Sequence, residues 1–298
     1  MVADFKYFLD VSEDTQSPPP PFFKGGIEGG FYGRVYQKSP LLPFTKRGDN
    51  NPLNPPFPDK NIQGQVLRGN KKLIYKTRDP FEFISFVEWS IIDTALEKME
   101  GFYQVHGGAV VKDNRGIILP AAPGSGKTML TVGLSMNGFQ CLSDDIVLIE
   151  TQSLKINPFP RNIFITEEKK DIFEKYGYHL PLRKSEWKDM GGWDFIFNFK
   201  PEFSPVDFII FPQYNPAAKT ELKGFSKGAA IFEIIRESFN FHKFRDRGID
   251  LIQSLVERAE CFQLTVNNLN EAIDTISRLL KEQKLNETTR FHQMDTRI

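Results

Sequence analysis

The sequence is poor in cysteine and has no long apolar run. Cys141 and Cys261 are the two cysteines among 298 residues, and both lie in apolar, strand-like stretches. Two such residues suit buried free thiols of a reducing compartment better than a disulfide framework. No stretch approaches the roughly 18 apolar residues of a membrane span, and the first residues show no signal-peptide pattern. We therefore expect a cytoplasmic protein without a membrane partner.

An excess of charge of one sign is missing as well. The chain has 38 Lys and Arg against 38 Asp and Glu, so its formal net charge is zero. This balance argues against nucleic acid or an anionic membrane surface as a partner. Aromatic residues are plentiful at 13%, including 28 Phe, and they supply ample material for a hydrophobic core. The length allows one large domain or two small ones.

The N-terminal part differs in composition from the rest. Residues 17–30 and 50–58 are rich in Pro and Gly and show no periodicity. Such a composition cannot bury enough apolar surface to order itself, so we expect residues 1–62 to be mostly a flexible insertion. A ligand for an aromatic groove is the alternative interpretation of a Pro-rich segment.

A small α+β preface is expected at residues 63–100. Residues 65–68 and 72–75 have the apolar, β-branched character of strands. Residues 80–99 carry apolar side chains at helical spacing, and Pro80 suits the first turn of a helix.

The most informative stretch is Leu-Pro-Ala-Ala-Pro-Gly-Ser-Gly-Lys-Thr at residues 119–128. Short apolar strands precede it at 109–111 and 116–119, and helical spacing follows it at 129–136. A glycine-rich turn between a strand and a helix directs backbone N–H groups at phosphates. The helix adds its positive N-terminal end. The context therefore predicts a phosphate-binding loop, although the usual pattern begins with Gly where this chain has Ala121.

Each polar position of this loop has an expected task. Gly124 and Gly126 allow the tight turn, Lys127 places a charge on the β- and γ-phosphates, and the Thr128 hydroxyl is a ligand for Mg²⁺. The predicted nucleotide-binding residues are Pro123, Gly124, Ser125, Gly126, Lys127 and Thr128. A glycine-rich helix cap with an incidental Lys is the alternative.

An acidic pair, Asp144 and Asp145, begins 17 residues after Lys127. It lies between two strand-like stretches. On a strand the two carboxylates would point to opposite faces, and at a strand end they would fork apart. One could hold Mg²⁺ while the other accepts a proton from an attacking hydroxyl. An ordinary solvated Asp-Asp turn is the alternative.

His106 begins the strand before the loop and is one of four His in the chain. At the edge of that strand it could tune a nearby base or contact a phosphate. A structural or surface His is the alternative for a lone His before Gly-Gly.

Taken together, His106, the Pro-Gly-Ser-Gly-Lys-Thr turn and Ser-Asp-Asp at 143–145 resemble the HPr kinase/phosphorylase catalytic domain. The chain is still more similar to the HPr kinase-related proteins called HprK-related kinase A. The likeness covers roughly residues 63–280. The segments that carry the closer likeness are 88–91, 211–214, 222–227, 237–242 and 261–264.

The resemblance implies a fold related to phosphoenolpyruvate carboxykinase, with ATP and Mg²⁺ as cofactors. It implies that Asp145 is the catalytic base, that His106 supports it, and that Lys127 is the third catalytic residue. Thr128 and Asp144 are the implied Mg²⁺ ligands. Arg161 falls where related kinases place basic residues near the phosphates, and a plain loop Arg is the alternative.

The implied partner is a small protein or peptide acceptor, and the implied assembly is a homo-oligomer, because HPr kinases form hexamers. HPr kinase/phosphorylases carry a second glycine-rich signature that interacts with the HPr substrate. No copy of it occurs between residues 162 and 200 of this chain. That absence argues against HPr itself as the substrate and against the phosphorylase reaction.

The rest of the chain is expected to form an α/β catalytic domain over residues 101–285, with a tail at 286–298. Amphipathic helices are predicted at 228–239, 248–259 and 270–280, and strands at 206–211, closed by Pro212, and at 260–266. The middle segment, residues 163–199, is hard to interpret: its stretches 178–187 and 191–194 are loop-like with large aromatics, and we expect either a mobile substrate-binding loop or a plain insertion. Lys223 and Lys227 could contact an acidic substrate or simply begin a helix.

The function predicted from these features is an ATP- and Mg²⁺-dependent kinase that phosphorylates a hydroxyl, as on a Ser of a small protein or peptide. A small-molecule kinase on the same fold is the second candidate. A nucleotide-binding switch without transfer is the third.

Overall fold

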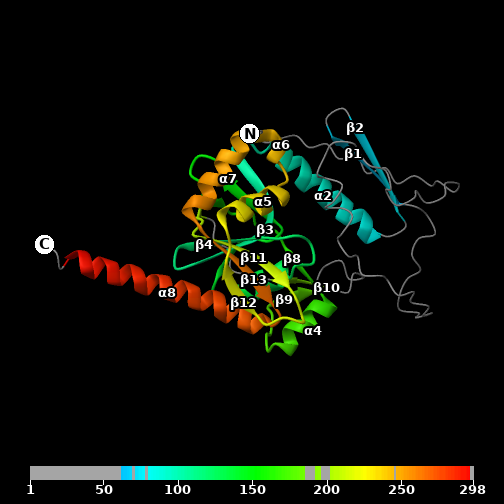
Figure 1. Ribbon diagram of the computed structural model, residues 1–298. Helices are drawn as coiled ribbons and strands as arrows, with labels where there is room; N and C mark the ends of the chain where they lie inside the picture. The colour runs from blue at the N-terminus through cyan, green and yellow to red at the C-terminus, as the bar shows by residue number, and fades with distance from the viewer. Residues whose placement is uncertain are drawn as a thin grey trace. The chain divides into compact units, whose positions relative to one another are not determined.

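The computed structural model describes residues 62–68, 71–77, 80–184, 192–195, 202–244 and 246–295 (Figure 1). The described chain divides into two compact units, and the division falls between Glu100 and Gly101. Apart from Ile62, the segment predicted as a flexible insertion lies outside the described residues.

The first unit is a β-hairpin followed by a helix. Strands β1 (Ile62–Arg68) and β2 (Lys71–Thr77) pair antiparallel, and α2 (Pro80–Lys98) follows. Pro80 occupies the first helical position, where its missing N–H is not needed. The predicted strands and helix of the preface are confirmed.

The second unit is built on a mixed sheet, which confirms an α/β fold. In the sheet, β4, β11 and β13 run parallel, and the remaining pairs are antiparallel. The strands, in spatial order, are β12 (Glu221–Gly224), β13 (Glu260–Val266), β11 (Phe208–Tyr214), β4 (Arg115–Pro120), β3 (Phe102–Lys112), β6 (Ile146–Glu150) and β7 (Ile156–Asn157), with β5 (Gln140–Ser143) also on β3.

The predicted crossover after the glycine-rich turn is present. Both β4 and β5 pair antiparallel with β3, so these two strands run in the same direction on either side of it. Helix α3 (Lys127–Met136) connects them. The turn that follows β4 and the acidic pair that follows β5 therefore lie at the same edge of the sheet.

Helices cover both faces of this sheet (Figure 1). One apolar cluster packs α3 and α8 (Leu269–Asp295) on one face, and the other packs α5 (Lys227–Arg236) and α7 (Asp246–Arg258) on the opposite face. The alternation of strand side chains decides which face each residue enters. On β4, Ile117 and Leu119 join the α3 cluster, and Ile118 joins the α5 cluster.

The described part of the middle segment, 163–199, contains regular structure, and the loop-like interpretation was wrong at 182–184 and 192–194, which lie in strands. Strands β8 (Ile163–Thr166), β10 (Gly192–Phe195) and β9 (Leu182–Lys184) form an antiparallel sheet in this order. Helix α4 (Glu167–Lys175) begins where the Thr166 hydroxyl accepts a hydrogen bond of 3.3 Å from the Lys169 N–H. A capping Thr before two acidic residues is a recognisable helix start.

Two predicted ends also differ from the structure. Strand β11 continues through Pro212 to Tyr214, because β4 pairs only with Phe208 and Ile209 and leaves one side of the later residues without a strand. A proline is tolerated on such an edge. Helix α8 runs on to Asp295, through the stretch expected as a tail, since no Gly or Pro interrupts it.

Gly108 is required by the close approach of α3 to β3. A Cβ atom at this position would overlap the Thr131 hydroxyl, which belongs to a fully buried residue of α3. We expect Gly108→Ala to lower the free energy of unfolding by about 1–3 kcal/mol, because overpacking displaces the helix.

Urea unfolding measures this change, with Gly228→Ala as the matched control. A Cβ at Gly228 meets no atom within 4 Å, and this residue lies in the first turn of α5. The control is expected to be as stable as the wild type or more so, because Ala favours a helix over Gly. Equal stability of the Gly108 variant and the wild type would contradict the close approach.

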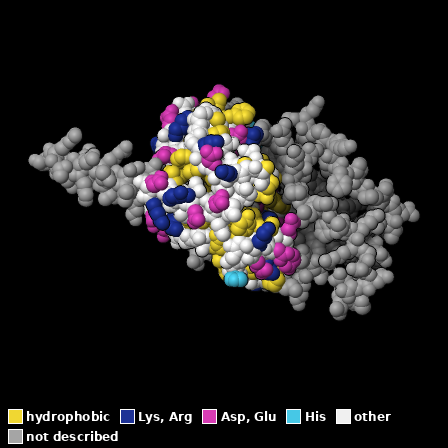
Figure 2. Space-filling view, turned by 60° about the horizontal axis from the view of Figure 1, so that its bottom comes forward, with side chains coloured by type: hydrophobic (Ala, Val, Ile, Leu, Met, Phe, Trp, Pro, Cys, Tyr) yellow, Lys and Arg dark blue, Asp and Glu magenta, His cyan; other side chains and the backbone are white. Residues whose placement is uncertain are grey.

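None of the described helices combines the length and the apolar character needed to cross a bilayer. On the face in Figure 2, basic and acidic side chains are interspersed rather than gathered into a patch of one sign. The absence of a nucleic-acid partner stays a prediction.

Candidate active site

The glycine-rich turn joins the carboxyl end of β4 to the start of α3. Gly124 and Gly126 have φ angles of 84° and 88°, a left-handed backbone that side chains other than Gly rarely adopt. Helix α3 begins after Gly126, and no side chain caps its first N–H groups. Free N–H groups at a helix N-terminus, together with the helix dipole, favour an anion such as phosphate.

The acidic pair occupies the bend between β5 and β6. Asp145 has a φ of 71°, and its carbonyl accepts a 3.2 Å hydrogen bond from the Gly107 N–H. The pair thus lies at a strand end, as one of the two predictions has it, but the carboxylates do not fork apart, since both face the Lys127 ammonium group. The Asp144 side chain is 5% exposed, whereas that of Asp145 is 38% exposed. Asp145 is thus the carboxylate that a substrate can reach.

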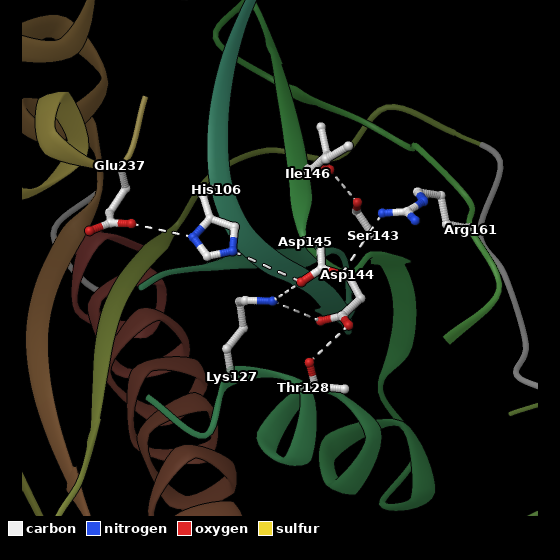
Figure 3. A network of polar contacts seen from close by, with 9 residues as sticks. All are labelled: His106, Lys127, Thr128, Ser143, Asp144, Asp145, Ile146, Arg161 and Glu237. Atoms are coloured by element: carbon white, nitrogen blue, oxygen red, sulfur yellow. Dashed lines mark hydrogen bonds and ion pairs between the residues drawn. The ribbon is translucent and has the colours of Figure 1, made fainter. Parts of the chain in front are cut away.

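Lys127 lies between the two carboxylates (Figure 3). Its ammonium group forms an ion pair with Asp145 Oδ1 and lies 3.6 Å from Asp144 Oδ1. Burial alone would lower the pKa of Lys127, but the charges of Asp144 and Asp145 outweigh it and raise the pKa above its usual value. The ammonium group is therefore charged at neutral pH. Its contact with nucleotide phosphates stays a prediction.

Thr128 and Asp144 bring two oxygens together, since the Thr128 hydroxyl donates a 3.1 Å hydrogen bond to Asp144 Oδ2. Burial raises the pKa of Asp144, although Lys127 opposes the shift. The other oxygen, Asp144 Oδ1, is buried and has no hydrogen-bond partner among the described residues. The Lys127 ammonium group, 3.6 Å away, is too distant for a hydrogen bond, so a bound cation could still satisfy this oxygen.

This donor set fits Mg²⁺. The described residues contain no cluster of three or more His, Cys, Asp or Glu that could enclose a metal ion. Mg²⁺ commonly takes one or two protein oxygens and keeps its other positions for water and substrate phosphates. Thr128 and Asp144 are the two protein oxygens that could hold it.

His106 lies between Asp145 and the carboxylate of Glu237, which is 131 positions later in the sequence. Its Nδ1 is 3.3 Å from Glu237 Oε2, and its Nε2 is 4.0 Å from Asp145 Oδ1. A carboxylate on Nδ1 fixes the orientation of the ring and leaves Nε2 to face Asp145. His106 thus lies beside the acidic pair, which agrees with the interpretation that it could tune a nearby base rather than with a surface His.

Arg161 completes the surroundings of Asp145, with its Nη1 atom 3.8 Å from Asp145 Oδ2. Burial on its own would raise the pKa of Asp145. The charges of Lys127, His106 and Arg161 outweigh burial and hold the pKa below its usual value. Asp145 is therefore ionised at neutral pH and is available as a proton acceptor.

Glu237 is the site residue whose contact the sequence analysis missed. Directly after α5, the chain extends along β3, where the His106 N–H donates to the Glu237 carbonyl at 2.7 Å and the Phe239 N–H donates to the Gln104 carbonyl at 2.9 Å. Asn240 extends this pairing, because its side chain accepts a 2.9 Å hydrogen bond from the Gln104 N–H. The predicted helix 228–239 therefore ends at Arg236.

Lys227 has a structural contact. Its ammonium group donates to the Val256 carbonyl at 2.6 Å and to the Ala259 carbonyl, at the carboxyl end of α7. A cation is favourable there. Lys223 forms an exposed ion pair with Glu221 at 2.8 Å. The structure shows no approach of either residue to the acidic pair.

The contact between His106 and Glu237 predicts a pH-dependent stability. Burial would raise the pKa of Glu237, but the hydrogen bond and charge of His106, with Arg236, lower it. The unfolded chain then binds more protons than the folded one in acid, so stability falls as the pH drops. We expect Glu237→Gln to cost about 1.5 kcal/mol near neutral pH. This gap should shrink below about pH 4.3.

Urea unfolding at several pH values tests this expectation. The exposed Glu257, which accepts a hydrogen bond from Gln253 on α7, supplies the control Glu257→Gln. The control should follow the wild-type curve throughout. A gap for Glu237→Gln that is the same at all pH values would contradict the assigned contact between Glu237 and His106.

No protein-family model and no curated protein sequence matches this chain. Solved structures do match, among them the Hpr(Ser) kinase/phosphatase from Coxiella burnetii. That match has a TM-score of 0.28 and 14% sequence identity, and it covers 62% of this chain and 98% of the other. A similarity of this size carries no argument about the function of this chain.

Proposed function

We propose that the protein is an ATP- and Mg²⁺-dependent kinase that transfers the γ-phosphoryl group to a hydroxyl. The observation that carries this proposal is the ion pair between Lys127 and Asp145 beside a glycine-rich turn. This ion pair brings a buried cation and an ionised, partly exposed carboxylate into one cluster. In-line phosphoryl transfer needs positioned phosphates, charge neutralisation and a proton acceptor.

The phosphates are held by this chain through three kinds of group. The N–H groups of the turn and of the first turn of α3 surround the phosphate chain. Lys127 is shared between the acidic pair and the β- and γ-phosphates, since the negative phosphates compete for its ammonium group. Thr128 and Asp144 would hold Mg²⁺, which supplies neutralisation of phosphate charge when it is bound.

Asp145 accepts the proton of the acceptor hydroxyl as a bond forms between the acceptor oxygen and the γ-phosphorus. The bond from that phosphorus to the bridging oxygen breaks, and ADP leaves with the electron pair. Arg161, at 3.8 Å from Asp145, is placed to neutralise charge on the transferring group. His106 and Glu237 keep Asp145 oriented. Lys127 also lowers the pKa of Asp145, so Asp145 becomes a stronger base as Lys127 turns toward phosphate.

The acceptor that we propose is a Ser of a small protein or peptide, as the sequence resemblance implies. A hydroxyl of a small molecule is the alternative acceptor. Neither is distinguished by the residues around Asp145, because these act on the transferred group and the proton and not on the rest of the acceptor.

The test is phosphoryl transfer from γ-labelled ATP to a fractionated extract that contains proteins, peptides and metabolites. We expect label on Ser in a protein or peptide fraction, and its loss when a chelator removes Mg²⁺. Label in the metabolite fraction alone would replace the acceptor by a small molecule. Measurable ATP binding without any labelled product would favour a nucleotide-binding switch.

A further inference from the structure

Tyr214 is an exposed aromatic residue that lies beside the glycine-rich turn. Along β11, Phe208 and Ile210 face the α3 cluster, so the alternation of the strand places Tyr214 on the same side. A Cβ atom built on Gly126 would lie 3.8 Å from the Tyr214 Cβ. The Tyr214 side chain therefore stands next to the N-terminus of α3.

The ring of Tyr214 is available for a ligand. The residue is 54% exposed, and within the described part of the chain the structure gives it neither a hydrogen bond nor an aromatic neighbour. Burial of an aromatic ring is favourable relative to its exposure to water. An exposed ring beside the glycine-rich turn therefore suggests that a ligand covers it.

The order of the strands gives the site a direction. The acidic pair follows β5, on the β3 side of β4, whereas β11 pairs with the opposite side of β4. The γ-phosphate must lie at Asp145, where transfer takes place. The phosphate chain then passes over the turn at Gly126, and the nucleoside end emerges on the β11 side.

We propose that Tyr214 stacks against the base of the bound nucleoside triphosphate. This inference rests on the proposed function and adds the residue that recognises the nucleoside. It favours a purine over a pyrimidine nucleoside triphosphate, because the larger purine ring offers more stacking area.

Recognition by stacking reads the face of the base and not its edge. The polar neighbours of Tyr214 on the strand are engaged elsewhere, since Asn215 Oδ1 accepts a 3.0 Å hydrogen bond from the Ala217 N–H and Gln213 bonds to Gln263 at 3.3 Å. The contact that the proposal assigns to the base is the ring face of Tyr214, and stacking distinguishes adenine from guanine only weakly. ATP and GTP should bind with affinities within about tenfold of each other.

Calorimetric titration of the full chain with Mg-ATP and with Mg-tripolyphosphate tests the proposal. The variants are Tyr214→Ala, Tyr214→Phe and, as a control, Phe232→Ala. Phe232 is another exposed aromatic, 65% exposed on α5 over the opposite face of the sheet. Tripolyphosphate has the phosphates of ATP and no base, so it reports on the turn alone.

We expect Tyr214→Ala to weaken ATP binding about 5- to 100-fold and tripolyphosphate binding less than twofold. Tyr214→Phe and Phe232→Ala should bind both ligands like the wild type. Unchanged ATP affinity in Tyr214→Ala would overturn the stacking role and leave the proposed function intact. Equal weakening of both ligands would also overturn it, since Tyr214 would then support the turn. A wild type that binds neither ligand would overturn the proposed function itself.

Discussion

Asp145→Asn is expected to lower phosphoryl transfer by about 10²- to 10⁴-fold, the usual contribution of a positioned base. Nucleotide affinity should stay the same or increase slightly, because the substitution removes a negative charge near the γ-phosphate. Asn is the informative replacement. Asp145 has a φ of 71°, and Asn tolerates this left-handed backbone whereas Ala would add strain.

Single-turnover transfer from γ-labelled ATP measures the first quantity, and calorimetric titration measures the second. Asp113→Asn is the matched control, since Asp113 also has a positive φ, of 52°, in the exposed turn between β3 and β4. It should match the wild type in both measurements. Normal transfer by the Asp145 variant would show that the proton acceptor is another group.

Lys127→Met is expected to weaken Mg-ATP binding about 10- to 100-fold and to destabilise the fold. The binding loss corresponds to one charge-assisted contact with phosphate. The substitution also leaves two neighbouring carboxylates without their cation. We expect a loss of about 3 kcal/mol, the lower end for a broken buried ion pair, because the Asp145 side chain is 38% exposed and water screens its charge.

A double-mutant cycle with Asp145→Asn separates the two effects of Lys127. In the double variant, one carboxylate of the pair is neutral, so loss of the Lys127 cation destabilises the fold less than it does in the single variant. The stability losses of the two single variants should therefore not add. Urea unfolding of the four proteins gives the coupling, for which we expect at least about 1 kcal/mol. Simple additivity of the two single variants would mean that Lys127 does not stabilise the acidic pair.

The parts of the site that could be predicted from the sequence are those formed by residues close together in the chain. The turn at Gly124 and Gly126 needs glycine for its own backbone, so its pattern is legible without knowledge of the fold. The same holds for the crossover helix after Lys127 and for the acidic pair at a strand end. An α/β core followed from strands and helices that alternate along the chain.

The missing parts depend on contacts between distant segments. Glu237 lies 131 positions from His106, and its position follows from an extended segment that docks on β3 after α5. Because the prediction used helical periodicity alone, it extended the helix beyond its actual end at Arg236. In the same way, Pro212 reads as a strand end until the pairing of β11 shows an open side. The short strands of the β8–β10–β9 sheet are too brief for a periodic signal.

The segment after α5 has a consequence for the order in which the site is completed. The glycine-rich turn, Lys127 and the acidic pair all lie within β3 to β6, a stretch rich in short-range contacts that form early. Synthesis releases this stretch well before Glu237. Until Glu237 has been synthesised, His106 lacks the carboxylate that orients it. Under the proposed function, we expect a chain truncated before Glu237 to lack an oriented His106 beside Asp145, and therefore to transfer phosphate poorly even where it binds nucleotide.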